Sequence, residues 1–412
     1  MRVAATAEID LQTGALTSGR IDDIECLRAF AILGVLFHHM QGVLYYWSPA
    51  WMSQIFEYFA FWPGVDLFFA VSGFVIARSL LPELAGCAGN RAASRNVLLA
   101  FWIRRAFRLL PSAWLWLGLI LFAVWGFNDS GAFGSLRANL WATLMGMANL
   151  ANFRFADSFM QYEYGASFAY WSLSLEEQFY LLFPILAWAL RAYRLAWLLA
   201  ILILVQAILP RSVLGFVLRT DALAWGVLVA IACHSRFWKQ LQPWGLRSRW
   251  LRYPVLLSLV GSIAGLAAWN DPGSLNWRVA AIAVLAGTLV WIASYAQGYI
   301  CADGWLKRPL IWTGSRSYAI YLIHIPAYYF VRECFWRLGM AGDSPPPYSS
   351  FIYCASAMLL IALLAEANFR WIEVPLRDRG RRLARRFQHR DSNDSLLAPP
   401  SSPIPVNPPC QN

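Results

Sequence analysis

The sequence predicts an all-α polytopic integral membrane protein with about ten transmembrane helices and both termini in the cytoplasm. Three observations support this fold class. Hydrophobic residues make up 59% of the 412 residues and charged residues only 14%, whereas a soluble domain has about 25% charged residues. The apolar residues form successive blocks of about 20, the length that spans the hydrocarbon core of a bilayer. Basic residues collect in alternate gaps between these blocks.

Each apolar block is predicted to be a helix, because lipid offers no partners for backbone N–H and C=O groups. The 22 Trp and 17 Tyr residues suit the ends of such helices, where amphipathic rings lie at headgroup level. The predicted spans are residues 24–46, 57–79, 109–127, 171–190, 194–210, 213–233, 253–269, 278–297, 309–330 and 349–371.

The basic residues predict the orientation of these spans. With the N-terminus inside, Lys and Arg collect in the gaps that face the cytoplasm, as the positive-inside rule requires, and few lie in the opposite gaps. We therefore expect a multi-pass protein of the inner (cytoplasmic) membrane, embedded in the lipid bilayer. The residues of the cytoplasmic gaps are Arg91, Arg95, Arg104, Arg105, Arg108, Arg191, Arg194, Arg236, Lys239, Arg247, Arg249, Arg252, Lys307 and Arg308.

Three regions follow from this topology. Residues 1–21 form a cytoplasmic N-terminal segment without a signal peptide, and residues 22–376 form the transmembrane domain. Residues 377–412 form a cytoplasmic tail that is first basic and then, from residue 391, disordered and rich in Pro and Ser. The long external loop 128–170 is expected to carry a re-entrant or interfacial helix near Trp141.

Composition also bears on ligands. The net charge of +11 comes from Arg residues in short loops, so membrane orientation explains it better than nucleic-acid binding, and no nucleic-acid partner is expected. The seven Cys residues are scattered without metal-ligand spacing, and we expect no metal site.

Ionisable side chains at membrane depth are costly and are candidates for function. In the first predicted helix, Arg28 and His39 are eleven residues apart, which is about 1100° of rotation, or three turns plus about 20°. Glu25 lies about 60° to the other side of Arg28, whereas His38 points about 80° away. Glu25, Arg28 and His39 therefore share one face of the helix, and this geometry favours His39 over His38.

The two ends of this predicted helix are expected to have different roles. Arg28 is expected near the inner interface, beside the loop residues Arg104, Arg105 and Arg108, where these side chains would form a positive mouth suited to the phosphates of a nucleotide-containing donor. His39 is expected roughly 16 Å deeper, where a neutral imidazole can act as a general base. The alternative for the loop Arg residues is that they mark topology alone.

Four more ionisable residues fall at a similar depth and, together with His39, suggest a shared polar cavity. Structural roles are the alternative, because a buried carboxylate can simply pair with Arg219 or with backbone, and a lone His often packs without acting. Ser172 adds a hydroxyl to the same region. The four residues are Asp66, Glu176, Asp221 and His324.

These segments together resemble the membrane-bound acyltransferase family 3, a mostly bacterial family. The resemblance runs through residues 22–376 and rests on motifs that occur in order. They are Arg28 with His39, GVDLFFAVSGFVI (64–76), RRAFRLLP (104–111), WSLSLEEQFYLLFP (171–184), RTDALAWG (219–226), SYAIYLIH (317–324) and WIEVPL (371–376).

The resemblance implies an O-acyltransferase that moves an acetyl or other short acyl group from cytoplasmic acyl-CoA to a carbohydrate hydroxyl, commonly on an extracytoplasmic glycan. It implies that Arg28 and His39 form the essential motif of the first span. It also places Arg105 and Arg108 in a basic motif, and Ser172 and Glu176 in a Ser-Leu-x-x-Glu motif. No esterase-like domain follows residue 376, so we expect this chain to complete the reaction itself or to pass the acyl group to a separate extracytoplasmic acyltransferase partner.

The resulting hypothesis places the donor phosphates on Arg28, Arg105 and Arg108, with acyl-CoA, most simply acetyl-CoA, as co-substrate and no bound cofactor. His39 either deprotonates the acceptor hydroxyl or carries the acyl group transiently, and both roles stay open. Glu176 would orient the imidazole or position the acceptor. The alternative function is a transporter that exports a glycan intermediate or an acylated metabolite, although the sequence shows neither an internal repeat nor paired broken helices.

Overall fold

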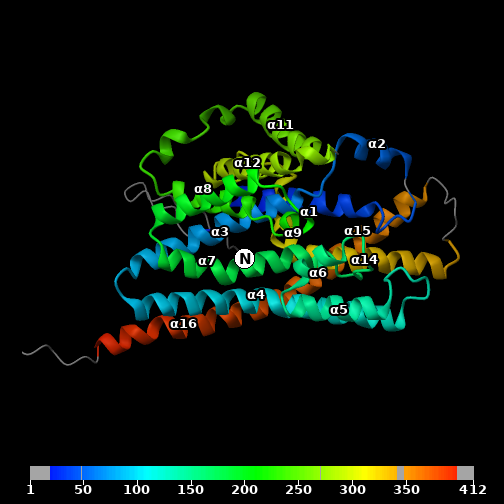
Figure 1. Cartoon of the computed structure of the whole chain (residues 1–412), viewed down its shortest axis with the longest axis horizontal. Helices are drawn as coiled ribbons and strands as arrows, with labels where there is room; N and C mark the ends of the chain where they lie inside the picture. The colour runs from blue at the N-terminus through cyan, green and yellow to red at the C-terminus, as the bar shows by residue number, and fades with distance from the viewer. Residues whose placement is uncertain (1–18, 48, 270, 341–347, 397–412) are drawn as a thin grey trace, which may run out of the picture.

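The computed structural model describes residues 19–47, 49–269, 271–340 and 348–396, and regular secondary structure in these residues is helical. Residues 1–18 of the predicted N-terminal segment and residues 397–412 of the predicted tail lie outside them. Most of the long helices run along the length of the molecule (Figure 1). The α-helices are α1 (Asp22–Met40), α2 (Ala50–Tyr58), α3 (Gly64–Gly86), α4 (Arg91–Gly126), α5 (Leu136–Met147), α6 (Ala151–Ser158), α7 (Tyr170–Ala189), α8 (Ala192–Ile208), α9 (Val213–Val217), α10 (Asp221–Ala232), α11 (Arg249–Ala268), α12 (Leu275–Ser294), α13 (Lys307–Ser315), α14 (Ser317–Arg337), α15 (Ser349–Asn368) and α16 (Val374–Leu396).

The apolar blocks of the sequence appear as helices, and six helices of the described chain are long and apolar enough to cross a membrane. The chain is therefore a multi-pass membrane protein, whereas the count of ten spans and the cytoplasmic termini stay predictions. Two of the six join consecutive helices, α9 with α10 and α15 with the start of α16, and the ranges are Gly64–Gly86, Arg91–Gly126, Val213–Ala232, Arg249–Ala268, Leu275–Ser294 and Ser349–Phe387.

Several predicted spans differ from the structure in detail, and in three of them a helix ends early or is interrupted. The first was expected to reach residue 46, but α1 ends at Met40, and the chain turns at Gly42 with a φ of 78°. The span 213–233 is divided into α9 and α10, and the span 309–330 is divided into α13 and α14 by Arg316. A hydropathy average over about 20 residues does not detect a break of one to three residues.

Helix α3 packs most closely against α10. A Cβ atom at Gly73 would lie 2.1 Å from the Leu223 carbonyl oxygen, and one at Gly226 would lie 2.0 Å from the Ala70 carbonyl oxygen. Small residues at such a crossing let two backbones approach within van der Waals contact. The two glycines therefore bring Asp66 and Ser72 of α3 into the centre of the bundle.

The loop between α4 and α7 contains α5 and α6, and α5 includes Trp141, where a helix was predicted. The turn between α5 and α6 docks on the side of α7. The Gln178 side chain donates to the Asn149 carbonyl at 2.9 Å, and the Ser174 hydroxyl accepts from the Ala151 N–H at 3.2 Å. Two polar residues of α7, Ser174 and Gln178, therefore have structural partners in this turn.

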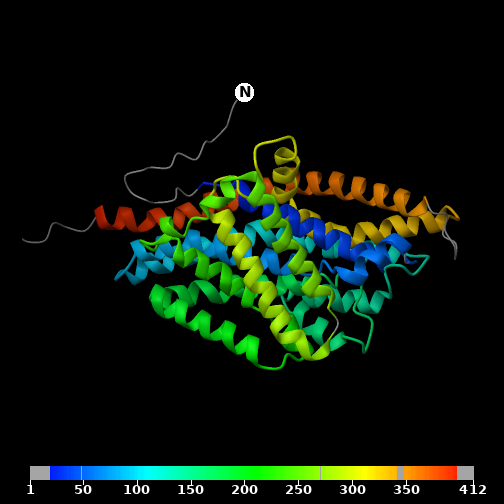
Figure 2. The ribbon, with the colours of Figure 1, turned by 90° about the horizontal axis from the view of Figure 1, so that it is seen from above.

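The C-terminal helix corrects one prediction. A π-helical turn at Phe369–Glu373 joins α15 to α16, and the two form one long run across the molecule, with α16 lying along α4 (Figures 1 and 2). Helix α16 reaches Leu396, so residues 391–396, which were expected to be disordered, are helical. The stretch before the first tail proline contains no helix-breaking residue beyond Gly380, and Gly380 lies against Phe107 of α4.

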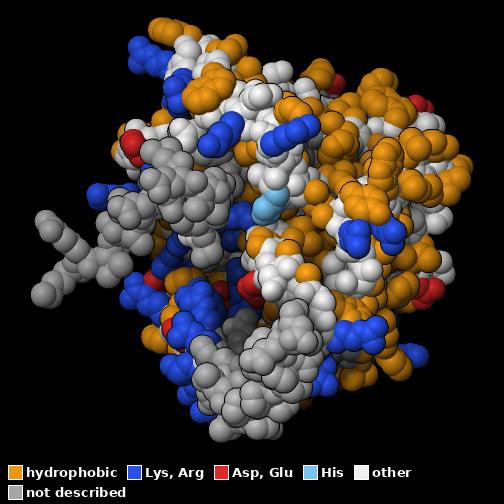
Figure 3. Space-filling model, turned by 90° about the vertical axis from the view of Figure 1, so that its left-hand side faces the viewer, with side chains coloured by type: hydrophobic (Ala, Val, Ile, Leu, Met, Phe, Trp, Pro, Cys, Tyr) orange, Lys and Arg blue, Asp and Glu red, His pale blue; other side chains and the backbone are white. Residues whose placement is uncertain are grey.

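Basic side chains collect at one end of the molecule. This end contains the start of α4, the turn between α7 and α8 and part of α16, and Figure 3 shows Lys and Arg side chains spread across it around a hollow. The exposed Arg residues in these segments are Arg91, Arg95, Arg191, Arg194, Arg379, Arg381, Arg382, Arg385 and Arg386. We call this end the basic end.

Candidate active site

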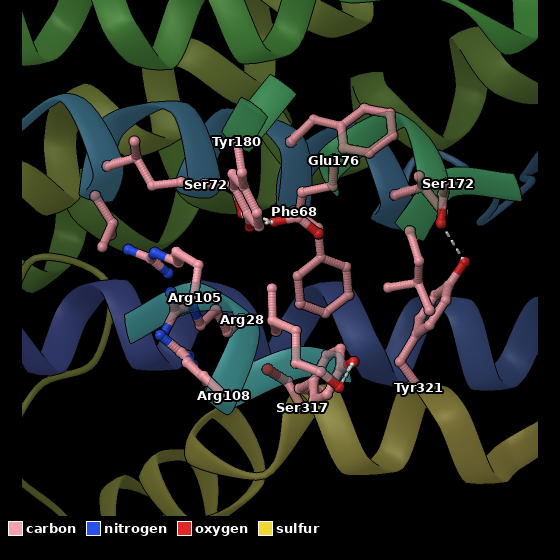
Figure 4. Close-up of a pocket in the computed structure, with 17 residues that line it drawn as sticks. Arg28, Phe68, Ser72, Arg105, Arg108, Ser172, Glu176, Tyr180, Ser317 and Tyr321 are labelled. Carbon is pink, nitrogen blue, oxygen red and sulfur yellow. Dashed lines mark hydrogen bonds between the residues drawn. The ribbon is translucent and has the colours of Figure 1, made fainter. Parts of the chain in front are cut away.

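A pocket in the helix bundle brings together several of the predicted site residues (Figure 4). Helices α1, α3, α4, α7 and α14 all contribute side chains to it. We call it the basic pocket, and its polar lining consists of Arg28, Ser72, Arg105, Arg108, Ser172, Glu176, Tyr180, Ser317, Tyr318 and Tyr321.

The three Arg residues predicted to bind the donor gather on one side of the basic pocket. Arg28 Nη1 lies 3.2 Å from Glu25 Oε1, so part of its charge is compensated. The Arg105 guanidinium lies 5.3 Å from the centre of the Tyr180 ring, a cation–π distance. Neither Arg105 nor Arg108 forms a salt bridge with any described residue, and so both guanidinium groups are available to an anion.

A carboxylate and two hydroxyls form the centre of the basic pocket. Glu176 accepts hydrogen bonds from the Ser72 hydroxyl and from the Tyr180 hydroxyl, and these two hydroxyls lie 3.3 Å apart. Tyr180 follows Glu176 by one helical turn, a spacing that allows side-chain contact. Tyr180 was not among the predicted site residues, although its i, i+4 spacing from Glu176 can be read from the sequence.

This arrangement corrects the interpretation that Glu176 orients the His39 imidazole. Within the described chain, the hydrogen bonds of Glu176 go to Ser72 and Tyr180, and His39 lines a different pocket. The cause is the packing of α7, which turns Glu176 toward α3. Ser172 lies one turn away from Glu176, and its hydroxyl is 2.6 Å from that of Tyr321.

A second pocket adjoins the basic pocket and contains the histidines of α1. Val65 and Tyr321 line both pockets, and they form the partition between them. We call the second cavity the histidine pocket; it is lined by Val35, His38, His39, Trp62, Val65, Phe155, Phe168, Trp171, Phe216, Arg219 and Tyr321. His38 thus lines the same cavity as His39, which the angular argument from one helix did not anticipate.

His39 has a partner from the far end of the sequence. Its Nδ1 atom lies 3.2 Å from Nε2 of His324, and Nδ1 of His324 lies 2.6 Å from the carbonyl oxygen of Tyr321. His324 is completely buried, whereas His39 is partly exposed to the pocket. The structure therefore brings His39 and His324 together, whereas Glu176 lines the basic pocket and Asp221 lies outside both pockets, so the five residues do not share one cavity.

The two predicted aspartates have arginine partners. Asp66 accepts from Nε and Nη2 of Arg219 at 2.8 and 3.0 Å, and Arg219 is also packed among aromatic rings, with that of Phe216 at 4.3 Å. Asp221 pairs with Arg211 outside both pockets. Both carboxylates therefore form an ion pair with an arginine, as the alternative of a purely structural role predicts. The guanidinium of Arg219, which Asp66 binds, also lines the histidine pocket.

No group of three or more His, Cys, Asp or Glu side chains in the described residues is placed to hold a metal ion. The polar groups of the two pockets instead provide guanidinium groups for an anion, one hydrogen-bonded carboxylate and imidazole nitrogens.

Comparisons with known proteins agree with the motifs. The family model described as an acyltransferase domain matches residues 21–366, which confirms the resemblance. The chain is 26% identical to O-acetyltransferase OatA of Staphylococcus aureus over 389 residues, which cover 87% of this chain and 57% of that protein. It is 26% identical over 409 residues to "Putative peptidoglycan O-acetyltransferase YrhL" of Bacillus subtilis, covering 90% of this chain and 57% of that protein. The chain thus spans little more than half the length of these relatives, and no solved structure matches it significantly.

Proposed function

The chain belongs to this acyltransferase domain family, and from that premise we propose that it is a membrane O-acyltransferase. It moves an acetyl or other short acyl group from cytoplasmic acyl-CoA to a hydroxyl of a carbohydrate, on an extracytoplasmic polysaccharide or glycolipid. The observation that carries this proposal is the junction of two pockets. One presents unpaired guanidinium groups and the other an imidazole, with Tyr321 and Val65 between them.

The basic pocket suits the donor. Guanidinium groups bind phosphate through paired hydrogen bonds, and Arg105 and Arg108 have no salt-bridge partner among the described residues. Arg28 contributes a third, partly compensated charge. The phosphates of acyl-CoA bind at these residues, and the acyl-pantetheine arm extends along α1 toward His39.

The histidine pocket suits the transfer. His39 takes the proton of the acceptor hydroxyl while the hydroxyl oxygen attacks the thioester carbonyl carbon. The new C–O bond forms, the C–S bond breaks, and the proton passes to the departing thiolate. In the other form of the mechanism, an imidazole nitrogen of His39 attacks the thioester carbonyl carbon, the C–S bond breaks, and CoA leaves as the thiol with the proton of the other ring nitrogen. The acceptor oxygen then attacks the acyl-imidazole, the C–N bond breaks as the new C–O bond forms, and the hydroxyl proton returns to the imidazole.

The acceptor is a carbohydrate in this proposal because both named relatives carry O-acetyltransferase names, and one name specifies peptidoglycan. Trp62, Trp171 and Phe168 give the histidine pocket aromatic surfaces on which the C–H faces of a sugar ring can pack. Glu176 and the hydroxyls of Ser72 and Tyr180 instead contact the donor arm near its phosphates, because the Tyr180 ring lies 5.3 Å from the Arg105 guanidinium. A separate extracytoplasmic acyltransferase partner would receive the acyl group if the chain does not complete the transfer itself.

Transport is the second candidate, and one observation favours it. The breaks at residues 218–220 and at Arg316 interrupt two predicted spans, and broken helices are common in transporters. A variant that loses acyl transfer while the membrane still exports the glycan would separate the two functions.

The test is acyl transfer in isolated membranes supplied with radiolabelled acetyl-CoA and a native glycan. We expect the wild-type protein to label the glycan and His39→Ala to lose about 10²- to 10⁴-fold of the rate, the usual contribution of a general base. His234→Ala is the matched control, because it removes a histidine that lies outside both pockets. Wild-type membranes that transfer no label from acetyl-CoA or succinyl-CoA would contradict the proposal.

The same membranes distinguish the two roles of His39. Without an acceptor, an acyl carrier accumulates label on the protein, and His39→Ala abolishes that label. A general base leaves the protein unlabelled under the same conditions.

A further inference from the structure

In the hydrogen bond between His39 and His324, the other contacts of His324 determine which ring donates and which accepts. We propose that His324 is a positioning residue that holds His39 in the tautomer with the proton on Nδ1, so that Nε2 carries the free electron pair used in acyl transfer. This inference rests on the proposed function and adds to it the residue that prepares His39. It applies to His39 as general base and as acyl carrier, because both roles use an unprotonated ring nitrogen.

The first step is the hydrogen bond of His324 to backbone. Its Nδ1 lies 2.6 Å from the carbonyl oxygen of Tyr321. A carbonyl oxygen can only accept, so Nδ1 of His324 carries a proton and donates. In the neutral ring, Nε2 of His324 is then an acceptor.

The second step is the charge of His324. The side chain is completely buried, and it forms no salt bridge with a carboxylate among the residues that the structure describes. Burying an unpaired charge is expensive, so the neutral imidazole is favoured. Its ring faces the rings of His39, Tyr321 and Tyr328, none of which supplies a compensating negative charge.

The third step assigns the donor in the hydrogen bond between the two rings. Nε2 of His324 accepts, and the nitrogen 3.2 Å away is Nδ1 of His39, so this Nδ1 is the donor. In a neutral imidazole with the proton on Nδ1, the lone pair is on Nε2. The ring that carries this lone pair lines the histidine pocket, where the acceptor hydroxyl is proposed to bind.

The other side chains around His39 do not replace this hydrogen bond, and its remaining polar contact is the backbone of Val35, one turn earlier on α1. His38 is its neighbour on α1, with ring centres 5.4 Å apart, and its Nδ1 is buried without a hydrogen-bond partner in the described structure. Phe168 is apolar, and Arg219, the charged residue lining the pocket, is held by Asp66. Without His324, His39 can adopt the Nε2–H tautomer, which cannot accept a proton at Nε2.

The kinetic test compares two substitutions of His324 with a control on the same helix. We expect His324→Leu to lower kcat by about 10²-fold or more and to leave the KM for acetyl-CoA within about twofold, because the basic pocket is unchanged. His324→Gln should recover most of kcat, since its amide oxygen reaches the position of Nε2 and accepts from Nδ1 of His39. Tyr328→Phe removes another hydrogen bond between α14 and α1, that to the Leu36 carbonyl at 3.0 Å, and should lower thermal stability without lowering kcat.

The spectroscopic test reads the tautomer directly. The chain has five His residues, so ¹⁵N-histidine labelling of the full chain in lipid nanodiscs gives few signals, and His39→Ala assigns that of His39. We expect the Nδ1–H tautomer in wild-type protein and in His324→Gln, and the Nε2–H tautomer in His324→Leu. A folded His324→Leu protein with wild-type kcat, or a wild-type His39 with its proton on Nε2, would overturn the inference.

These outcomes are separate from failure of the proposed function. If the wild type transfers no acyl group, the function is wrong, whereas the tautomer measurement still tests the hydrogen-bond assignment. If the wild type is active and depends on His39 but not on His324, the function stands and the positioning role is wrong.

Discussion

The crossing of α3 and α10 yields a prediction about stability that the structure specifies atom by atom. In Gly73→Ala, the new Cβ would lie 2.1 Å from the carbonyl oxygen of Leu223 and 3.0 Å from its carbonyl carbon. Both atoms belong to the backbone of α10, so no side-chain rotation relieves the clash. Ordinary van der Waals contact begins at 3.4 Å, and the helices must therefore separate locally by about 1.3 Å, the difference between 3.4 and 2.1 Å.

Overpacking of this kind costs about 1–3 kcal/mol. The cost rises if the separation also loosens the Asp66–Arg219 pair, whose hydrogen bonds of 2.8 and 3.0 Å join the same two segments. Thermal unfolding in detergent can be followed with a thiol-reactive dye, because Cys26 is buried and free in the folded protein. We expect Gly73→Ala to react at a lower temperature than the wild type.

Gly118→Ala is the matched control for this prediction. Gly118 lies within α4, and a Cβ there would have no atom within 4 Å. Replacing such a glycine by alanine favours the helix by roughly 0.5–1 kcal/mol, so this variant should be as stable as the wild type or more stable. Equal unfolding temperatures for Gly73→Ala and Gly118→Ala would refute the close-packing argument.

Three further outcomes follow from the two pockets. Arg108→Gln should raise the KM for acetyl-CoA roughly 10- to 150-fold, because a charge-assisted hydrogen bond of about 1.5–3 kcal/mol is lost. Steady-state kinetics with a phosphate-free acetyl thioester should show no such change in KM, and an equal change would contradict phosphate binding at Arg108. Arg219→Gln leaves Asp66 buried without its partner and should destabilise the protein by about 3–5 kcal/mol. The double variant that also carries Asp66→Asn should recover part of the folded yield in detergent, and no recovery would contradict the pairing of Asp66 with Arg219. Acetyl phosphate should not replace acetyl-CoA as donor in the membrane assay, and transfer from acetyl phosphate would contradict a donor that must reach from Arg108 to His39.

The sequence predicted the helical elements better than their ends. Apolar blocks mark where a helix crosses lipid, but α4 begins at Arg91, far before the predicted start at residue 109. Its first half contains five Arg residues, which lower the hydropathy without weakening the helix. Helix α2, Ala50–Tyr58, was not predicted, because its short length leaves no membrane-span signal.

In the candidate site too, the sequence predicts relations within one helix but not the contacts between helices. The relation of Arg28 to His39 follows from the rotation of one helix, and the sequence could therefore predict it. Glu176 and His39 lie on different helices, and the choice of their partners depends on how α3, α7 and α14 pack. Since His39 and His324 are 285 positions apart in the chain, the angle of a residue on its own helix could not identify the neighbour that it meets.

The length of α1 constrains the class of donor. Arg28 and His39 lie on one unbroken helix, Asp22–Met40, so they are separated along its axis by roughly 16 Å, at about 1.5 Å per residue. A donor that is anchored by its phosphates at Arg28 and reacts beside His39 must therefore hold its acyl group far from its charges. An acyl phosphate joins the two groups directly and cannot satisfy both positions at once. Acyl-CoA places the pantetheine arm between its nucleotide phosphates and its thioester, so the proposed donor would meet both positions with its arm passing Val65 and Tyr321, which line both pockets.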